Sequence, residues 1–170
     1  MGGRITVFGT SHRLQGIENV PWAIDDPMYL VALKNCLRRK DFIFEEASGR
    51  VPTTAQGLAV AKFGQGHYLD VDPSIEERQQ LGIGQTELPT FIDPSDSNSD
   101  HIVQQFFGEQ EKRETIWLRK IQERTFDNAV FICGYLHTLS MSFRLCEAGY
   151  DVEAFYYLPH AKLCDKQHFG

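Results

Sequence analysis

The sequence predicts a single α/β domain over residues 1–170, with a mostly parallel or mixed sheet of about five strands covered by helices. Three observations lead to this prediction. Short apolar segments alternate along the chain with segments of helical periodicity. A chain of 170 residues fits one domain, and 42% hydrophobic with 24% charged residues is typical of a globular protein with a buried core. No repeat of about twenty to fifty residues is present.

The first part of the chain is expected to form two strands around one helix. The strand Ile5–Phe8 leads into Gly9-Thr10-Ser11-His12. A helix follows Asp25-Asp26-Pro27, because a carboxylate caps the free amides of a helix start and proline suits the first turn. The run Asp41–Phe44 is continuously apolar after its first residue, as in strands covered on both faces, and it ends in Glu45-Glu46.

The middle of the chain is expected to hold a helix, a strand, a second helix and a long loop. A helix follows Pro52-Thr53-Thr54, and the strand His67–Asp72 comes next. The spacing of Ser74 and Glu77 predicts a capping box. The segment from 82 to about 110 is rich in Gly, Pro, Ser and Asp, which predicts a long loop with one short helix near Ile102–Phe107.

The last part of the chain repeats the alternation of helix and strand. The expected elements are a helix Glu111–Arg124, a strand Asn128–Cys133 that ends in Gly134-Tyr135-Leu136-His137, a helix Thr138–Ala148 and a strand Val152–Leu158.

Several side chains with catalytic chemistry fall at or just after the ends of the expected strands. They are His12, Glu45, Glu46, Asp72 and His137. Ligands of parallel sheets bind beyond the carboxyl ends of the strands, so we expect these side chains to share one rim.

Two Gly-x-x-His motifs stand at strand ends. Glycine allows the chain to leave a strand in conformations that other residues avoid, and the histidine then faces a cleft. A neutral imidazole offers one nitrogen to a proton or a metal while a partner holds the other. Alternatively, His12 and His137 cap the amides of the following helices. A third match, Gly64-Gln65-Gly66-His67, precedes a strand and is set aside.

The acidic pair Glu45-Glu46 offers a carboxylate for a metal, a general base or an ion pair. Successive side chains of a strand point to opposite faces, so one of the two reaches the site, and we favour Glu46. The alternative is that both glutamates only make a turn soluble.

Arginines are expected to supply the positive charge of the site. Arg113, followed by Glu114, stands at the expected start of a helix, where a cation opposes the helix dipole. A buried carboxylate or an anionic substrate group would explain its position. Asp72 and Arg78 flank another helix start, where they form a local ion pair or orient the site from its rim.

Charge and cysteine content narrow the class of protein. The net charge of −6 argues against nucleic acid as a partner, and we interpret Arg38-Arg39-Lys40 as a solvated helix end. The four cysteines form no Cys-x-x-Cys pair, so we expect free thiols and a reducing, cytoplasmic location. No apolar stretch of about 18 residues predicts a membrane span, and no signal peptide is visible.

The order of these motifs resembles the TraB/PrgY/GumN family, within the wider group of Tiki proteases, ChaN-like proteins and erythromycin esterases. The first matching motifs are Gly9-Thr10-Ser11-His12 and the strand ending in Glu45-Glu46, with Arg50 nearby. The later ones are Asp72 to Arg78, the helix with Arg113-Glu114, Trp117 and Ile121, and Gly134-Tyr135-Leu136-His137.

The resemblance implies a hydrolase-like pocket of His12, His137, a glutamate at 45 or 46, and Arg113. In the Tiki branch such residues are associated with metal-dependent peptide cleavage. In the erythromycin esterase branch a histidine is thought to activate water without a metal.

We therefore expect a hydrolase that cleaves an ester or amide in a small molecule or peptide. In one form His12, His137 and Glu46 hold zinc, manganese or cobalt, and Arg113 binds the substrate carboxylate or the developing oxyanion. In the metal-free form His12 is the general base and Glu46 orients it.

Two other functions are open. The chain could be a non-catalytic module that binds a small ligand or regulates a partner. An interaction role rests on Phe155-Tyr156-Tyr157, in a final strand that either joins the core or forms a homodimer through its edge.

Overall fold

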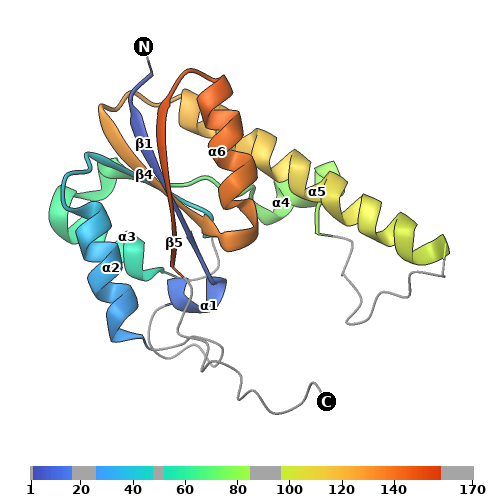
Figure 1. Ribbon diagram of the computed structural model, residues 1–170, viewed down its shortest axis with the longest axis horizontal. Coiled ribbons are helices and arrows are strands. Elements are labelled where there is room, and N and C mark those ends of the chain that lie inside the picture. Colours follow the sequence, from blue (N-terminus) through green and yellow to red (C-terminus); the bar gives the residue numbers. More distant parts are fainter. Residues whose placement is uncertain (1, 17–25, 48–51, 85–96, 158–170) are drawn as a thin grey trace, which may run out of the picture.

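The computed structural model describes residues 2–16, 26–47, 52–84 and 97–157, and it has a parallel sheet of five strands in the order β3-β2-β4-β1-β5 (Figure 1). The strands are β1 Arg4–Thr10, β2 Phe42–Glu45, β3 Tyr68–Asp70, β4 Asn128–Gly134 and β5 Asp151–Tyr157. All four strand pairings are parallel. The predicted α/β fold is thereby confirmed.

Helices cover both faces of the sheet. The helices α2 (Pro27–Leu37) and α3 (Thr54–Phe63) pack on one face, while α5 (Ser97–Gln122) and α6 (Thr138–Glu147) pack on the other. Shorter helices are α1 (His12–Gln15) and α4 (Ile75–Leu81). Side-chain caps define several starts: Asp26 caps α2 and Thr53 caps α3. The predicted capping box of Ser74 and Glu77 begins α4.

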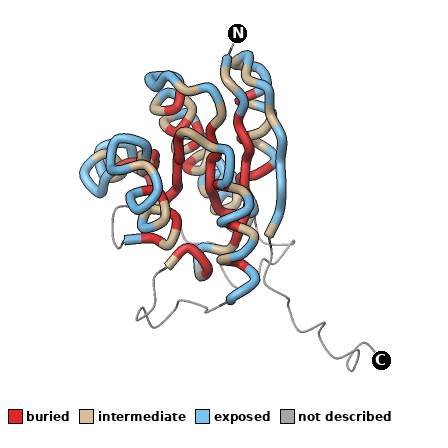
Figure 2. The backbone as a smooth tube through the Cα atoms, turned by 90° about the vertical axis from the view of Figure 1, so that its left-hand side faces the viewer, coloured by how far each residue is buried: buried red, intermediate tan, exposed pale blue. Residues whose placement is uncertain are grey.

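The core lies along the central strands (Figure 2). Every residue of β2 is buried, as are the last six of β4, because helices cover both of their faces. Phe44 and Phe131 pack toward α5 and α6, whereas Ile43 and Val130 pack toward α2 and α3. The edge strand β5 differs, since it has no buried residue.

The strand register brings three segments to one point. Thr10 at the end of β1 pairs with Gly134 at the end of β4, so the two Gly-x-x-His turns leave adjacent strands. On the other side of β4, Glu45 pairs with Ile132, and the Glu46 amide donates to the Ile132 carbonyl oxygen at 2.9 Å. Three chain segments therefore converge at the carboxyl end of β4.

The expected loop over 82–110 is wrong in its second half. Residues 97–110 belong to α5, one continuous helix of 26 residues that includes the expected short helix and the expected Glu111–Arg124 helix as far as Gln122. Short polar residues, which we interpreted as loop, are also favoured at helix starts. Gln104, Gln105, Glu109 and Gln110 then favour helix, and this segment contains no proline. Residues 85–96 lie outside the described part.

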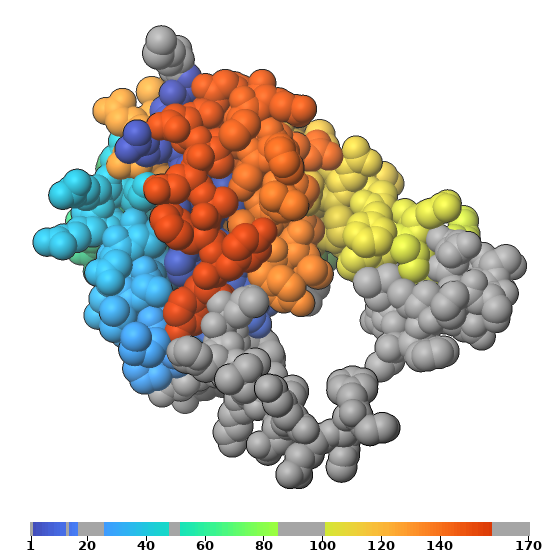
Figure 3. Space-filling view, in the orientation of Figure 1, coloured from blue at the N-terminus to red at the C-terminus, as the bar shows by residue number. Residues whose placement is uncertain are grey.

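α5 extends from the body of the molecule at its N-terminal end (Figure 3). It contacts the core through Trp117 and Ile121, in its C-terminal half. No helix within the described ranges is long and apolar enough to cross a membrane. The three cysteines in those ranges, Cys36, Cys133 and Cys146, are free thiols.

Candidate functional site

The two Gly-x-x-His turns meet at one buried carboxylate. Nε2 of His12 lies 3.6 Å from Oε1 of Glu46, and Nε2 of His137 lies 4.0 Å from the same oxygen. The other oxygen of Glu46 accepts a hydrogen bond of 2.8 Å from the Gly134 amide. The expected convergence of both histidines on a carboxylate is therefore present, and Glu46 is the glutamate that takes part in it.

The glycines of both motifs provide space. Gly134 has φ −57° and ψ 139°, which any residue adopts, so backbone freedom is not why glycine stands there. A Cβ at Gly134 would lie 2.6 Å from Nε2 of His12, and one at Gly9 would lie 1.9 Å from Oγ1 of Thr138. Each glycine therefore lets the opposite histidine turn approach its strand, which corrects the conformational reason we expected.

Each imidazole is held at its Nδ1 atom by a different partner. Nδ1 of His12 lies 2.7 Å from Oε1 of Gln15, within α1. Nδ1 of His137 lies 2.8 Å from Oε1 of Glu114, which also accepts a 2.6 Å hydrogen bond from the Ser140 hydroxyl. In both rings, Nε2 is the nitrogen that faces Glu46.

The partners of Gln15 fix the tautomer of His12. The Gln15 side-chain nitrogen donates to Oε1 of Glu45 at 3.3 Å and to the Glu46 carbonyl oxygen at 3.4 Å. Since the amide nitrogen faces two acceptors, its oxygen faces His12 and accepts a hydrogen bond from the protonated Nδ1. A neutral His12 ring then carries a lone pair on Nε2. Glu114, an acceptor when ionised, has the same effect on His137.

The carboxyl group of Glu114 is ionised more easily than usual. Burial opposes its charge, but hydrogen bonds from His137 and Ser140 outweigh that effect and lower its pKa. Nε of Arg144 lies 3.2 Å from its second oxygen and adds to the shift.

Arg113 bridges two buried carboxylates. Its guanidinium group donates to Glu46 and, at 3.1 Å, to both oxygens of Asp72. Burial disfavours its charge, yet the two carboxylates raise the pKa of Arg113 above its usual value. Its position needs no helix-dipole argument, because it lies in the C-terminal half of α5 and not at a helix start.

Asp72 is surrounded by donors. Arg78 forms the expected ion pair with it, and the indole Nε1 of Trp117 donates to it at 3.1 Å. The Trp117 ring lies 5.0 Å from the Arg113 guanidinium carbon and 4.8 Å from the His137 ring. Arg113 is therefore held in place by Asp72 and Trp117, and Arg78 in turn holds Asp72.

Glu45 points away from this centre into a second buried cluster. Its carboxyl group accepts hydrogen bonds from Thr53, Tyr68 and Gln15. Burial raises the pKa of Glu45 to about 7, although these three hydrogen bonds favour its charged form. Glu45 reaches His12 only through Gln15.

The donor set does not fit a metal well. Two imidazole nitrogens and a carboxylate oxygen are suitable ligands, but the Arg113 guanidinium already contacts the Glu46 oxygen that both rings face. Across the described ranges, no group of three or more His, Cys, Asp or Glu side chains is arranged to hold a metal ion.

The structure brings together seven of the eight candidate residues: His12, Glu46, Asp72, Arg78, Arg113, Glu114 and His137. Sequence reasoning missed Gln15. The signal was its position three residues after His12, one helical turn away, where side chains become neighbours.

No protein-family model matches this sequence, and a search of curated proteins finds no match.

Proposed function

We propose that the chain is a hydrolase that cleaves an ester or amide with water activated by His12. The observation that carries this proposal is the convergence of two Nε2 atoms on one side of Glu46, each ring being fixed through Nδ1. The order of motifs that resembles the TraB/PrgY/GumN group supports the same class of reaction.

The reaction needs one proton acceptor and one oriented water molecule. The water donates one hydrogen bond to Nε2 of His12 and one to Nε2 of His137, and its oxygen adds to the substrate carbonyl carbon while its second proton stays on that oxygen. His12 takes the proton and returns it to the leaving oxygen or nitrogen as the C–O or C–N bond breaks. His12 acts as the base because its side chain is 56% exposed, whereas that of His137 is 9% exposed.

Arg113 is a positioning residue in this scheme. Its guanidinium donates to Glu46, Asp72 and Gln110, so it holds Glu46, the carboxylate that both histidines face. Glu46 stabilises the charge that His12 acquires when it takes a proton.

A panel of small esters and peptide amides tests the proposal. We expect His12→Ala to lower kcat/KM by about 10²- to 10⁴-fold, the usual contribution of a general base. His67→Ala is the matched control, because it removes the histidine of the third Gly-x-x-His, which is exposed and contacts the Asp41 carbonyl oxygen. If the protein hydrolyses no substrate faster than His12→Ala, the binding or regulatory function replaces this one.

The same assay separates the metal-dependent form. Chelator-treated protein should keep its activity, and added zinc, manganese or cobalt should not raise it. A bound metal whose removal abolishes hydrolysis would assign His12, His137 and Glu46 as its ligands instead.

The free thiols are in keeping with a reducing, cytoplasmic location.

A further inference from the structure

A groove lies on the α2 side of the sheet, between α2, the edge strand β5 and its neighbour β1. It has a volume of about 620 Å³, within the usual range of about 300–1,000 Å³ for small-ligand pockets. Its lining includes Thr6 and Phe8 of β1, which are buried, and their partners on the edge strand β5, Glu153 and Phe155. None of the candidate site residues lines it.

The groove is basic at one end. Arg4, Arg38, Arg39 and Lys40 line it, and Glu153 is the one acidic residue among the described residues of its lining. This charge contrasts with the net charge of −6 for the whole chain. The run Arg38-Arg39-Lys40 is thus partly a solvated helix end, as expected, and partly the wall of a cavity.

Lys40 is the least exposed of the three residues in this run. Its Nζ atom donates to Oγ1 of Thr6 at 2.6 Å and to Oδ1 of Asn128 at 2.8 Å, and both acceptors are neutral. Burial lowers the pKa of Lys40, because its charge is partly removed from water. An anion beside Nζ would compensate that charge.

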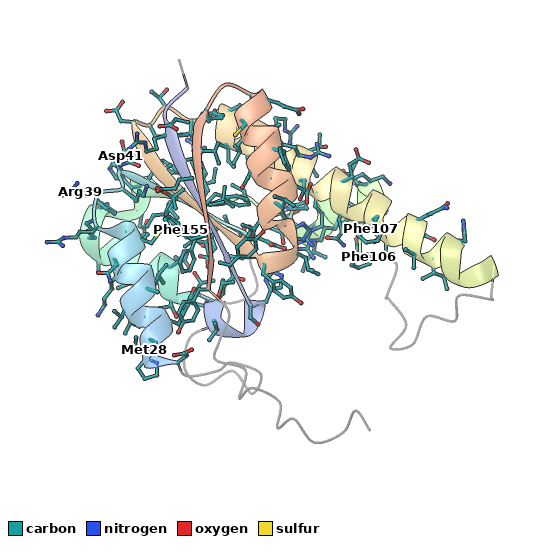
Figure 4. All side chains as sticks on the ribbon, in the orientation of Figure 1. Met28, Arg39, Asp41, Phe106, Phe107 and Phe155 are labelled. Atoms are coloured by element: carbon teal, nitrogen blue, oxygen red, sulfur yellow. The ribbon has the colours of Figure 1, made fainter. Side chains whose placement is uncertain are left out.

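The other end of the groove is aromatic. Phe8 and Tyr157 lie with ring centroids 6.5 Å apart. Phe155, which is labelled in Figure 4, is 48% exposed and also lines this end. Arg4 and Phe8 stand four residues apart on β1, so the basic and aromatic ends are separated by about 13 Å. The cavity therefore has a cationic end and an apolar end.

We propose that this groove binds a single-chain alkyl carboxylate, a ligand of the fatty-acid class, with its head at Lys40 and Arg39 and its tail against Phe8 and Phe155. Charge complementarity selects the anionic head, and the exposed aromatic surface selects the apolar tail. This inference is independent of the hydrolase proposal, since the two sites share no residue.

Isothermal titration calorimetry of the full chain with decanoate tests the proposal. We expect saturable binding that Arg39→Glu and Phe155→Ala each weaken by about tenfold. Each residue is exposed, so the fold should persist, which circular dichroism checks. Arg119→Glu and Phe143→Ala are matched controls on α5 and α6, and they should leave the affinity unchanged.

Two further ligands distinguish the contribution of the carboxylate head to binding from that of the alkyl tail. Acetate, which has only the head, and decanol, which has only the tail, should each bind at least tenfold more weakly than decanoate. Equal binding of decanol, no binding of decanoate, or an unchanged affinity of Arg39→Glu would overturn the proposal. So would a dimer in sedimentation velocity that Phe155→Ala dissociates, because the groove would then belong to a second copy of the chain.

Discussion

The two histidine turns have the same spacing and opposite surroundings. The His12 side chain is 56% exposed and rests on a neutral amide, Gln15. The His137 side chain is 9% exposed and rests on an ionised carboxylate, Glu114, that also binds Ser140 and Arg144. Identical motifs therefore produce one accessible ring and one ring fixed in an ionic network.

The acids behind the two rings differ in the same way. Behind His12, burial raises the pKa of Glu45 to about 7. Behind His137, burial also opposes charge on Glu114, but hydrogen bonds and neighbouring cations lower its pKa. The contrast suits a division of labour in which the exposed ring changes its protonation and the buried ring stays fixed.

The largest expected effect on stability comes from removing Arg113, which binds the carboxylate that both histidine turns face. Arg113→Met leaves Glu46 and Asp72 buried without their common partner, and we expect a loss of about 3–5 kcal/mol in the free energy of unfolding. Urea unfolding measures this loss, with the exposed Arg119→Met as control. A loss below about 1 kcal/mol would mean that the two carboxylates do not depend on Arg113.

The two acids should give opposite pH dependences. Because the folded-state pKa of Glu45 is raised from 4.5 to about 7, its contribution to stability is full below pH 4.5 and is lost as the pH rises through 7. Relative to Glu45→Gln, the wild type should lose on the order of 3 kcal/mol over this window. Urea unfolding at several pH values measures the difference.

Glu114 should contribute to stability with a pH dependence opposite to that of Glu45. Its folded-state pKa is lowered, so its contribution is present above its unfolded pKa of 4.5 and is lost as the pH falls through the folded value. Parallel pH profiles of Glu45→Gln and Glu114→Gln, each relative to wild type, would contradict the contrast between the two turns.

The two histidines should differ in how much their replacement by alanine destabilises the fold. His137→Ala removes a hydrogen bond from a buried carboxylate and should cost about 2–3 kcal/mol. His12→Ala, at an exposed position, should cost less than about 1 kcal/mol. Thermal unfolding of both variants checks the order, and equal losses would remove the structural distinction.

Gln15→Met should have a small effect on stability and a specific effect on the His12 ring. It removes the hydrogen bonds of the Gln15 amide to the ring, to Glu45 and to the Glu46 carbonyl oxygen at a net cost of about 1–2 kcal/mol, and it frees the choice of tautomer. Nitrogen chemical shifts of His12 should change, while those of His137 should not. Gln79→Met, at an exposed position in α4, is the control.

Much of the site followed from strand ends. The carboxyl-end rule for parallel strands predicted that His12, Glu46, Asp72 and His137 lie together, and strand alternation predicted that only one of Glu45 and Glu46 reaches the site. The structure agrees on both points of geometry. The catalytic roles of these residues stay predictions.

The sequence was less informative where local composition and tertiary packing disagree. Residues 97–100 have the composition of a loop and yet begin α5, because a helix start favours the same short polar residues. The role of Gln15 depends on two acceptors from β2, which no local pattern could indicate. The close packing of Gly9 and Gly134 against the opposite turns also involves residues far apart in the sequence, so no local pattern indicates it.

The central claim is that both imidazoles point a bare Nε2 toward Glu46. Long-range proton–nitrogen NMR spectra of the histidine rings, recorded at mildly alkaline pH, test it most directly, with His12→Ala and His137→Ala to assign the signals. The account predicts a proton on Nδ1 and none on Nε2 in both rings. A proton on Nε2 with a bare Nδ1, in either ring, would contradict it.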